Sequence, residues 1–392
     1  MYILHVNSFY NLTGGAELTT NKQISIAEQN GHRSGIIYFC DDEQSVQPSA
    51  PGNRFIKKLP VEASNKTIND QLIEIICKEK PDIVNYHNFW PHDDLIFDER
   101  LQNLGKTILC EHSSTLTCVG RNRFHERLCK PCFMDLGLKC VFLPTLTKCV
   151  YFRNPLLLYQ RLKKYRNLPH IWNKAFLLAQ SELIKNFMIN TGFDKNKITV
   201  IPNYVDIPEH WTKPSGRKIL FVGRLEIEKG LQDILHAITD IDCELRICGT
   251  GSYMPEIESL MRNLNIENKV TFLGKLGKDE MKIEYEDTAM VVFPSRWLES
   301  CPNVVLEAMA HARPVVAYDS GGVRFLIKDN LTGFIIPCGH KDLLKNKISF
   351  LLDNPQQAAQ MGQNGRAMCD QKFTYDNYKR SLMKFYETVY KS

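Results

Sequence analysis

Short apolar runs alternate with longer amphipathic stretches along both halves of the chain. This alternation is typical of βα units, in which a helix follows each strand and packs against a parallel sheet. In the first half the expected strands are Ile3–Asn7, Gly35–Phe39, Ile83–His87, Thr107–Glu111, Ala175–Gln180 and Ile198–Ile201. In the second half they are Ile219–Val222, Leu245–Cys248, Val270–Leu273, Met290–Phe293, Val315–Ala317 and Phe334–Ile336. The pattern predicts an α/β fold with two parallel sheets.

The chain is also longer than one hydrophobic core usually supports. It has 392 residues, whereas single cores stop growing at roughly 250 to 300 residues, so we expect two domains. Residues 202–216 contain Pro208, Pro214 and Gly216 and show little periodicity, which is typical of a linker. We therefore expect the division near residue 205. Residues 373–391 are expected to form a terminal helix.

Composition excludes several classes of protein. Hydrophobic residues at 43% and charged residues at 24% describe an ordinary globular protein and not a disordered one. No apolar run approaches the roughly 18 to 20 residues that cross a bilayer, and the first residues do not read as a secretion signal. The 13 cysteines are an odd number, so reduced thiols are expected. We expect a cytoplasmic protein.

Two carboxylates, Glu299 and Glu307, lie eight residues apart around the predicted start of a helix. Because Met290–Phe293 reads as a buried strand, Glu299 would lie in the following loop and Glu307 in the first turns of the helix. Both would face the crevice beyond the carboxyl ends of the strands, where open α/β sheets bind ligands. Carboxylates accept hydrogen bonds from sugar hydroxyls, so the pair favours a polyol. The alternative is one capping and one solvated glutamate.

This stretch resembles the E-x7-E signature of retaining glycosyltransferases of family 4, which have the GT-B fold. Three further segments resemble family motifs. The donor-phosphate segment of the family is similar to residues 223–230, from Gly223-Arg224 to Lys229-Gly230. The last glycine loops of the family are similar to Gly321-Gly322 and Thr332-Gly333. Near the amino end, Ile3–Asn7 followed by Gly14-Gly15 is similar to the first strand and glycine loop. The resemblance covers essentially the whole chain.

The resemblance implies two Rossmann-like domains that face each other across an interdomain cleft. Residues 1–205 would form the acceptor-binding domain, with a cysteine-rich insertion at about 112–150 that a subset of the family shows. Residues 206–372 would bind the nucleotide sugar, and residues 373–392 would cross back onto the first domain as a helix.

The resemblance also implies roles for single residues. Glu299 would contact the hydroxyls of the donor sugar, and Glu307 would contact the ribose. Arg224 and Lys229 would stabilise the leaving diphosphate, whose negative charge grows as the glycosidic bond breaks. The backbone amides of Gly14, Gly15, Asn303 and Val304 would add donor contacts. His112 resembles the histidine near the reacting carbon, with a structural turn histidine as the alternative, and His87 is a weaker candidate of the same kind.

Metal binding is expected only in a structural role. Asp240-Ile-Asp242 precedes a predicted strand and so lies at the wrong end of the sheet for catalysis, and we expect no catalytic metal. Cysteines near His112 could supply the four thiols that zinc prefers. Cys118, Cys129, Cys132 and Cys140 are the expected set, and Cys149 is a competing ligand. An iron–sulfur centre and unliganded thiols are the alternatives.

Positive charge is concentrated in one segment. Residues 106–174 contain 13 Lys and Arg residues against three acidic ones, whereas the whole chain carries +5. Arg161, Lys163, Lys164 and Arg166 follow an apolar stretch, which suits contact with an anionic membrane. A solvated basic helix is the alternative. Nucleic acid is not expected, because no nucleic-acid-binding motif accompanies the charge.

Together these features predict a retaining, metal-independent hexosyltransferase. It would move a sugar from a nucleotide-diphosphate sugar to a hydroxyl of a glycan or lipid-linked glycan in bacterial surface polysaccharide assembly, at the inner face of the cell membrane. Retention follows from the resemblance alone. The alternatives are a nucleotide-sugar epimerase or phosphorylase on the same fold, and a zinc-stabilised protein that binds without catalysis.

Overall fold

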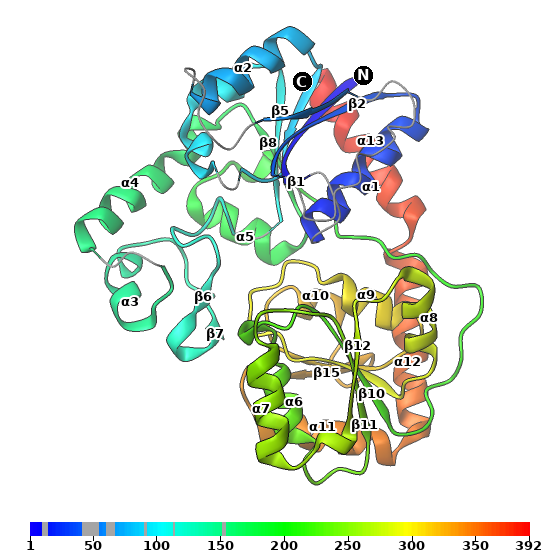
Figure 1. The fold of residues 1–392 in the computed structure, drawn as a ribbon. Helices are drawn as coiled ribbons and strands as arrows, with labels where there is room; N and C mark the ends of the chain where they lie inside the picture. The colour runs from blue at the N-terminus through cyan, green and yellow to red at the C-terminus, as the bar shows by residue number, and fades with distance from the viewer. Residues whose placement is uncertain (10–14, 41–54, 60–66, 90–91, 113, 151–153) are drawn as a thin grey trace.

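The structure is a computed structural model that describes residues 1–9, 15–40, 55–59, 67–89, 92–112, 114–150 and 154–392. Its ribbon forms two lobes, each built around one sheet (Figure 1). All strand pairs within these two sheets are parallel. The predicted α/β class with two parallel sheets is therefore confirmed.

The first sheet has seven strands in the order β3-β2-β1-β4-β5-β8-β9. The strand order reverses between β1 and β4, which marks the position where ligands bind in such sheets. Its strands are β1 (Tyr2–Phe9), β2 (Arg33–Cys40), β3 (Phe55–Lys58), β4 (Ile83–Tyr86), β5 (Lys106–Glu111), β8 (Phe176–Ala179) and β9 (Ile198–Val200).

The second sheet has six strands in the order β12-β11-β10-β13-β14-β15. Here the order reverses between β10 and β13, so the loops that follow these two strands meet at one edge. Its strands are β10 (Lys218–Val222), β11 (Glu244–Cys248), β12 (Val270–Gly274), β13 (Met290–Phe293), β14 (Val315–Tyr318) and β15 (Gly333–Ile336).

Helices connect the strands, and local sequence signals mark several of their ends. Asn154 caps α4, since its side chain accepts hydrogen bonds from the amides of Leu156 and Leu157. Gly192 ends α5 in the left-handed conformation. The helices are α1 (Gly15–Gln29), α2 (Ile68–Glu79), α3 (Lys139–Thr147), α4 (Pro155–Ile171), α5 (Glu182–Thr191), α6 (Leu231–Ala237), α7 (Met254–Leu264), α8 (Lys278–Glu286), α9 (Asn303–Ala310), α10 (Val323–Leu326), α11 (Lys341–Asp353), α12 (Pro355–Lys372) and α13 (Tyr375–Lys391).

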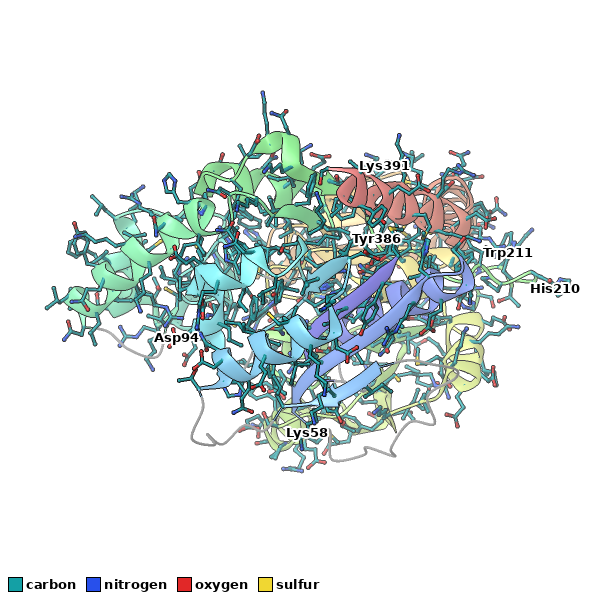
Figure 2. The ribbon with its side chains drawn as sticks, turned by 90° about the horizontal axis from the view of Figure 1, so that it is seen from above. Lys58, Asp94, His210, Trp211, Tyr386 and Lys391 are labelled. Atoms are coloured by element: carbon teal, nitrogen blue, oxygen red, sulfur yellow. The ribbon has the colours of Figure 1, made fainter. Side chains whose placement is uncertain are left out.

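The last helix, α13, packs against the first sheet although the chain reaches it from the second lobe (Figure 1). Its buried face carries Tyr378, Leu382, Phe385, Tyr386 and Val389. These side chains form one apolar cluster with strand residues of the first sheet. Figure 2 shows Tyr386 and Lys391 on this helix above the first sheet, whereas His210 and Trp211 project from the connection at the edge of the molecule. The terminal helix therefore ties the second lobe to the first.

One strand of the first sheet was not predicted. β3 contains two lysines and pairs only with β2 at the edge of the sheet. Charged side chains at an edge protect a sheet from pairing with other chains, and they also remove the apolar alternation that a sequence pattern needs.

The segment between β5 and α4 contains little regular structure beyond α3. A short antiparallel pair, β6 (Phe124–His125) and β7 (Lys130–Pro131), stands apart from the large sheets. None of the helices in the described ranges is long and apolar enough to cross a membrane.

The roles expected for residues 1–205 and 206–372, acceptor binding and nucleotide-sugar binding, stay predictions.

Candidate active site

Lys229 and Glu299 meet at the edge where the strand order of the second sheet reverses. Lys229 follows β10, and Glu299 follows the neighbouring strand β13. Lys229 Nζ donates a hydrogen bond to Glu299 Oε1 at 2.8 Å, and Ser295 Oγ donates to the same oxygen at 2.6 Å. The two charged side chains are only 19% and 15% exposed. The loops thus bring together a cation and a carboxylate that are 70 residues apart in the sequence.

Close backbone approaches hold these loops. Gly230 has φ +75°, and a Cβ atom there would lie 2.1 Å from the carbonyl oxygen of Pro294. At Gly322 a Cβ would lie 1.9 Å from the carbonyl oxygen of Ser300. The Gly322 amide donates to the Glu299 carbonyl at 2.7 Å. Only glycine fits at both positions without moving the backbone, so these residues fix the loop that carries Glu299.

Arg224 lies on the same edge but remains open to solvent. Its side chain is 64% exposed and lies 3.7 Å from the carboxylate of Glu228. A weak surface ion pair of this kind holds the guanidinium loosely. Arg224 can therefore turn toward an anion bound at this edge.

Glu307 lies on α9, the helix that begins at Asn303. Tyr285 donates a hydrogen bond from its hydroxyl to Glu307 Oε2 at 2.8 Å. Burial raises the pKa of the Glu307 carboxyl, while the Tyr285 hydrogen bond and the nearby Lys22 oppose this shift. Asn303 and Val304 are half-buried at the start of the helix. The structure thus places Glu307, Asn303 and Val304 on one short helix beside the Glu299 loop.

Lys22 was missed by the sequence analysis. It belongs to α1 of the first lobe, yet its charge acts on Glu307 and Asp206. Its Nζ donates to the backbone carbonyl of Tyr204 at 3.1 Å and lies 4.0 Å from the centre of the Tyr204 ring. Burial lowers the pKa of Lys22, and the two carboxylates oppose this shift. No sequence motif marked this lysine, because its partners are brought near only by the packing of the two lobes.

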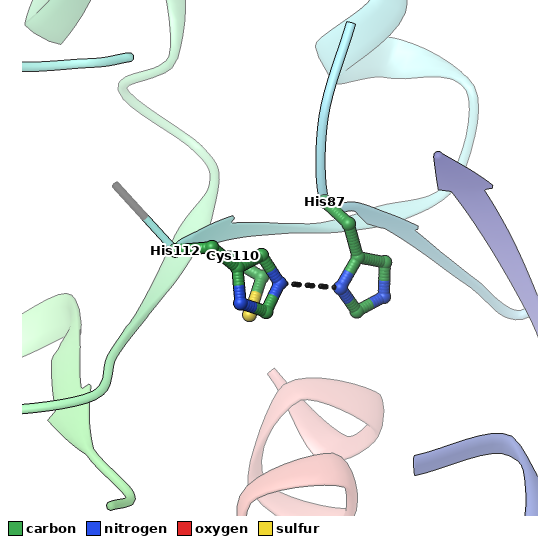
Figure 3. Close-up of side chains that lie close together, drawn as sticks. All are labelled: His87, Cys110 and His112. Carbon is green, nitrogen blue, oxygen red and sulfur yellow. Dashed lines mark hydrogen bonds between the residues drawn. The ribbon is translucent and has the colours of Figure 1, made fainter. Parts of the chain in front are cut away.

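The first lobe contributes a row of polar side chains. His112 follows β5, His87 follows β4, and Gln180 follows β8. His87 Nδ1 and His112 Nε2 are 2.9 Å apart (Figure 3). Gln180 Nε2 lies 3.2 Å from His112 Nδ1. Burial lowers the pKa of His112 to about 4. His87 was rated below His112 from the sequence, but the structure pairs them directly.

Ser300 and Asn203 join the two lobes at this site. Ser300 Oγ lies 2.9 Å from the backbone carbonyl of His112 and donates to Gln180 Oε1 at 2.7 Å. Asn203 Nδ2 donates to Asn303 Oδ1 at 3.0 Å. The expected residues Glu299, Asn303 and His112 are therefore linked through two side chains that the sequence analysis did not single out. Each of the two follows a predicted strand, which is the only signal that could have indicated them.

The two glycines near the amino end are placed differently. Gly14 lies outside the described residues. Gly15 begins α1, is exposed, and has open space where a Cβ atom would be. Thr19, one turn further on, donates from its hydroxyl to the Gly15 carbonyl at 2.8 Å, and the same oxygen lies 3.3 Å from Asn203 Oδ1. The start of α1 therefore lies near the junction of the lobes.

The cysteines of residues 112–150 separate into two environments. Burial raises the pKa of Cys132 to about 11, and Cys118 and Cys140 add to the shift. Cys118 and Cys140 also act on Cys149. Cys129 instead contacts Arg296. Burial lowers the pKa of the Arg296 guanidinium, but hydrogen bonds to Asp233 and Cys129 and their charges together raise it by more, so the pKa lies above its ordinary value.

Tighter clustering of metal-binding side chains occurs elsewhere. Over the described ranges, the one group of three His, Cys, Asp or Glu ligand atoms within 4.8 Å of one another is formed by His87, Cys110 and His112. No three of the five sulfurs near α3 reach that spacing in this part of the chain. The zinc site therefore stays a prediction.

Asp240 and Asp242 lie before β11, at the amino end of the second sheet. Asp240 accepts a hydrogen bond from Lys345 Nζ at 2.7 Å, and an Asp242 oxygen lies 3.8 Å from Arg217 Nε. Both carboxylates thus form surface ion pairs far along the sheet from Glu299.

Comparison with known proteins agrees with this geometry. Residues 206–368 match the family model described as glycosyl transferases group 1. The chain is 26% identical to the D-rhamnosyltransferase WbpZ of Pseudomonas aeruginosa over 75% of this chain and 70% of the relative. It is 24% identical to the O-antigen chain mannosyltransferase C of Escherichia coli over the full length of both. With other relatives, such as the alpha-D-kanosaminyltransferase of Streptomyces kanamyceticus, the match spans about half of the relative, 45% in that case.

Solved structures of similar shape cover the whole chain. Anabaena HepE in complex with UDP and glucose has a TM-score of 0.73 at 18% identity, covering 99% of this chain and 100% of that one. Sucrose-phosphate synthase from Thermosynechococcus elongatus has a TM-score of 0.75 at 17% identity, covering 100% and 99%. At this identity the likeness shows the fold, which is GT-B. Residues 206–368 are thus similar in sequence to the glycosyl transferases group 1, and the whole chain shares the fold of these solved structures.

Proposed function

We propose that this protein is a retaining hexosyltransferase that moves a sugar from a nucleotide-diphosphate sugar to a hydroxyl of a glycan or lipid-linked glycan. The Lys229–Glu299 pair carries the proposal, because it puts a phosphate partner and a sugar partner at one sheet edge. Relatives whose names specify rhamnosyl, mannosyl and kanosaminyl transfer support it, as does a similar fold that holds UDP and glucose.

The donor site follows from the chemistry of the two lobes. Lys229 and Arg224 neutralise the diphosphate as its charge grows, and the free amides at the start of α9 add hydrogen bonds. Glu299 accepts hydrogen bonds from sugar hydroxyls once the donor phosphates compete for Lys229. Glu307 accepts from the ribose hydroxyls, with Tyr285 holding its other contact. His112 faces the transferred sugar from the first lobe, and Gln180 contacts His112.

A panel of nucleotide sugars tests the proposal. A true donor at a hundred times its dissociation constant should stabilise the protein by about 2.7 kcal/mol, which thermal unfolding detects. The stabilising donor is then incubated with candidate acceptors, and the products are analysed by mass spectrometry. A new glycosidic product identifies a transferase. An epimerised nucleotide sugar or a sugar phosphate would instead identify the two alternative activities, and binding without turnover would identify a binding protein.

We further propose that residues 128–166 contact an anionic membrane that carries the acceptor. Eight large apolar side chains between residues 128 and 159 are 40% to 66% exposed. Three of them, Leu138, Phe142 and Leu146, are spaced four residues apart along α3. Exposed basic residues follow on α4, namely Lys163, Lys164 and Arg166. An exposed apolar patch beside basic residues fits the boundary between lipid headgroups and acyl chains. The eight are Leu128, Phe133, Leu138, Phe142, Leu146, Leu156, Leu157 and Tyr159.

We also propose a structural zinc ion in the cysteine-rich segment, with a revised ligand set. Cys118 and Cys140 act on both Cys132 and Cys149, and Cys118 also acts on Cys140, while Cys129 contacts Arg296. Zinc–sulfur bonds of about 2.3 Å would require the four sulfurs to draw together, and the bound thiols would be deprotonated.

A further inference from the structure

Three histidines form a continuous chain across the first sheet. His5 lies on β1, His87 follows β4 and His112 follows β5, and these strands are neighbours in the sheet. His5 Nδ1 lies 2.9 Å from His87 Nε2. His87 Nδ1 lies 2.9 Å from His112 Nε2, as Figure 3 shows. His5 is fully buried, and His87 is 6% exposed.

The rings meet edge to edge. The ring planes differ by 19° in the first pair and by 18° in the second, with centroids 5.2 Å apart in both. In each pair the ring centroids are 5.2 Å apart and the facing nitrogens 2.9 Å apart. The difference is about twice the distance from a ring centroid to its nitrogen, so the two centroids and the two nitrogens lie nearly on one line. Each contact is therefore a nearly linear N–H···N hydrogen bond in the plane of both rings.

This geometry fits a shared proton better than a metal ion. Zinc holds each ring nitrogen at about 2.0 to 2.1 Å in a tetrahedral arrangement, so two nitrogen ligands of one zinc ion would be about 3.3 Å apart. The facing nitrogens of His87 and His112 are closer than that, at 2.9 Å, which is an ordinary hydrogen-bond distance. Cys110 lies nearby, but burial raises the pKa of its thiol and so favours the neutral form, which is not a metal ligand.

The direction of the hydrogen bonds is set from the second lobe. The Cys301 backbone carbonyl can only accept, so the nitrogen 3.1 Å away is the Asn203 amide nitrogen, Nδ2. Asn203 Oδ1 therefore points the other way and accepts from Gln180 Nε2 at 3.1 Å. With its nitrogen on that side, Gln180 presents its oxygen to the hydroxyl of Ser300.

The same orientation propagates along the histidines. Gln180 Nε2 is a donor, so His112 Nδ1 accepts from it and the proton of His112 is on Nε2. His112 then donates to His87 Nδ1, and His87 donates from Nε2 to His5 Nδ1. Each ring has one donor and one acceptor nitrogen, and the sequence of bonds allows only one tautomer for His112 and His87.

We propose that Asn203 and Gln180 are positioning residues that lock His112 and His87 as neutral Nε2–H tautomers. Both ring nitrogens of His112 are engaged, so its ring orients the site and does not accept a proton from the acceptor hydroxyl. Asn203 donates hydrogen bonds to Cys301 and Asn303, which belong to the second lobe. The lock therefore forms only when the two lobes are in contact. The tautomers follow from the hydrogen bonds alone, whereas their effect on turnover rests on the proposed transferase function.

Nuclear magnetic resonance on the full-length protein labelled with ¹⁵N-histidine tests the lock. Long-range proton–nitrogen correlations should show His112 and His87 protonated on Nε2. Nitrogen–nitrogen coupling across the hydrogen bond should connect His87 Nδ1 with His112 Nε2. An Nδ1–H tautomer at His112, or the absence of this coupling, overturns the proposal.

Two variants separate positioning from folding. Gln180→Glu keeps the shape of the side chain but removes the donor, so the signals of His112 and His87 should both shift. Gln360→Glu changes an exposed glutamine on α12 in the same way and should shift neither. If Gln180→Glu folds and leaves both histidine signals unchanged, the lock does not exist.

Turnover and metal content complete the test. Gln180→Glu should lower kcat roughly ten- to a hundredfold with little change in donor affinity, since misplacing a site group by a fraction of an ångström acts on the reacting geometry. Equal kcat in the variant and the wild type overturns the positioning role, even if the tautomers are as expected. A bound transition metal that the Cys110→Ala variant loses would also overturn it, because a metal-bound nitrogen carries no proton.

Discussion

Lys229 Nζ lies 2.8 Å from Glu299 Oε1, and each side chain is less than one-fifth exposed. In this state the cation expected to hold the donor phosphates neutralises the carboxylate expected to hold the donor sugar. Breaking one partner of a shielded pair leaves the other uncompensated, so the pair persists until a ligand supplies replacements for both. A nucleotide sugar does so, because its phosphates replace Glu299 and its hydroxyls replace Lys229.

We predict that Lys229→Ala or Arg224→Ala lowers the turnover of nucleotide sugar by roughly a hundredfold or more, the usual scale for removing a group that stabilises transition-state charge. Initial rates at saturating donor measure the effect. Lys345→Ala is the matched control, since it removes a lysine–aspartate pair at the opposite end of the same sheet. Near-normal rates in both site variants would refute the phosphate assignment.

Acid should destabilise the fold through His311. Burial and the nearby cations of Arg313, Lys282 and Arg366 lower its pKa from 6.5 to about 4. Between these values the unfolded chain binds the proton and the folded chain does not, so stability rises with pH across the window and is lost as pH falls through it. One such group contributes at most about 1.4 kcal/mol per pH unit.

Urea unfolding between pH 4 and 7 measures this slope. We expect a shallower dependence in His311→Gln than in the wild type. The same substitution at exposed His210 is the control. An identical slope in His311→Gln and the wild type would show that His311 titrates alike in both states.

If the cysteine-rich segment holds zinc, freshly purified and reduced protein should carry about one equivalent. Chelation should then lower the melting temperature, because the metal affinity is part of the folding free energy. Cys149→Ser should remove the metal and Cys129→Ser should keep it, since the Cys129 thiol is engaged by Arg296. Elemental analysis that finds no metal in the wild type would discard the site.

The strands of the two sheets could be predicted because apolar runs are local signals. Lys229 and Glu299 could be predicted for a related reason, since motifs at the ends of strands β10 and β13 are local too. The chain's strand order then brings them together. The same rule applied to the first sheet indicates His87, His112 and Gln180, which follow neighbouring strands.

What the sequence could not provide are contacts that depend on how two lobes meet. Ser300 reaches Gln180 across 120 residues, and Asn203 reaches Asn303 across 100. Lys22 acts on Glu307 from the other lobe. Serine, asparagine and lysine are common on protein surfaces, so the residue type alone does not indicate that Ser300, Asn203 or Lys22 belongs to a site. The choice among the five cysteines stays a prediction for a similar reason, because the spacing of Cys129 and Cys132 does not determine which way each side chain points.

The last prediction concerns the exposed face of α3 and α4. Basic residues near an anionic membrane contribute about 1 kcal/mol each, and salt screens this attraction over a Debye length of about 8 Å at physiological ionic strength. Binding to vesicles that contain anionic lipid should therefore weaken steeply with salt. Reversing Lys163, Lys164 and Arg166 should abolish most of the salt-dependent part. Replacing Phe142 and Leu146 with serine should weaken binding at every salt concentration, because these side chains bury apolar area in the bilayer.

The control is Ile283→Ser with Leu331→Ser, which removes two exposed apolar side chains of the second lobe, 62% and 54% exposed. That variant should bind vesicles as the wild type does. Donor hydrolysis should be unchanged in all three variants, because the donor residues lie on the second sheet, whereas transfer to a lipid-linked acceptor should fall in the two α3 and α4 variants. If the wild type sediments equally little with neutral and anionic vesicles at low salt, this face is solvated and a soluble acceptor becomes the better assignment.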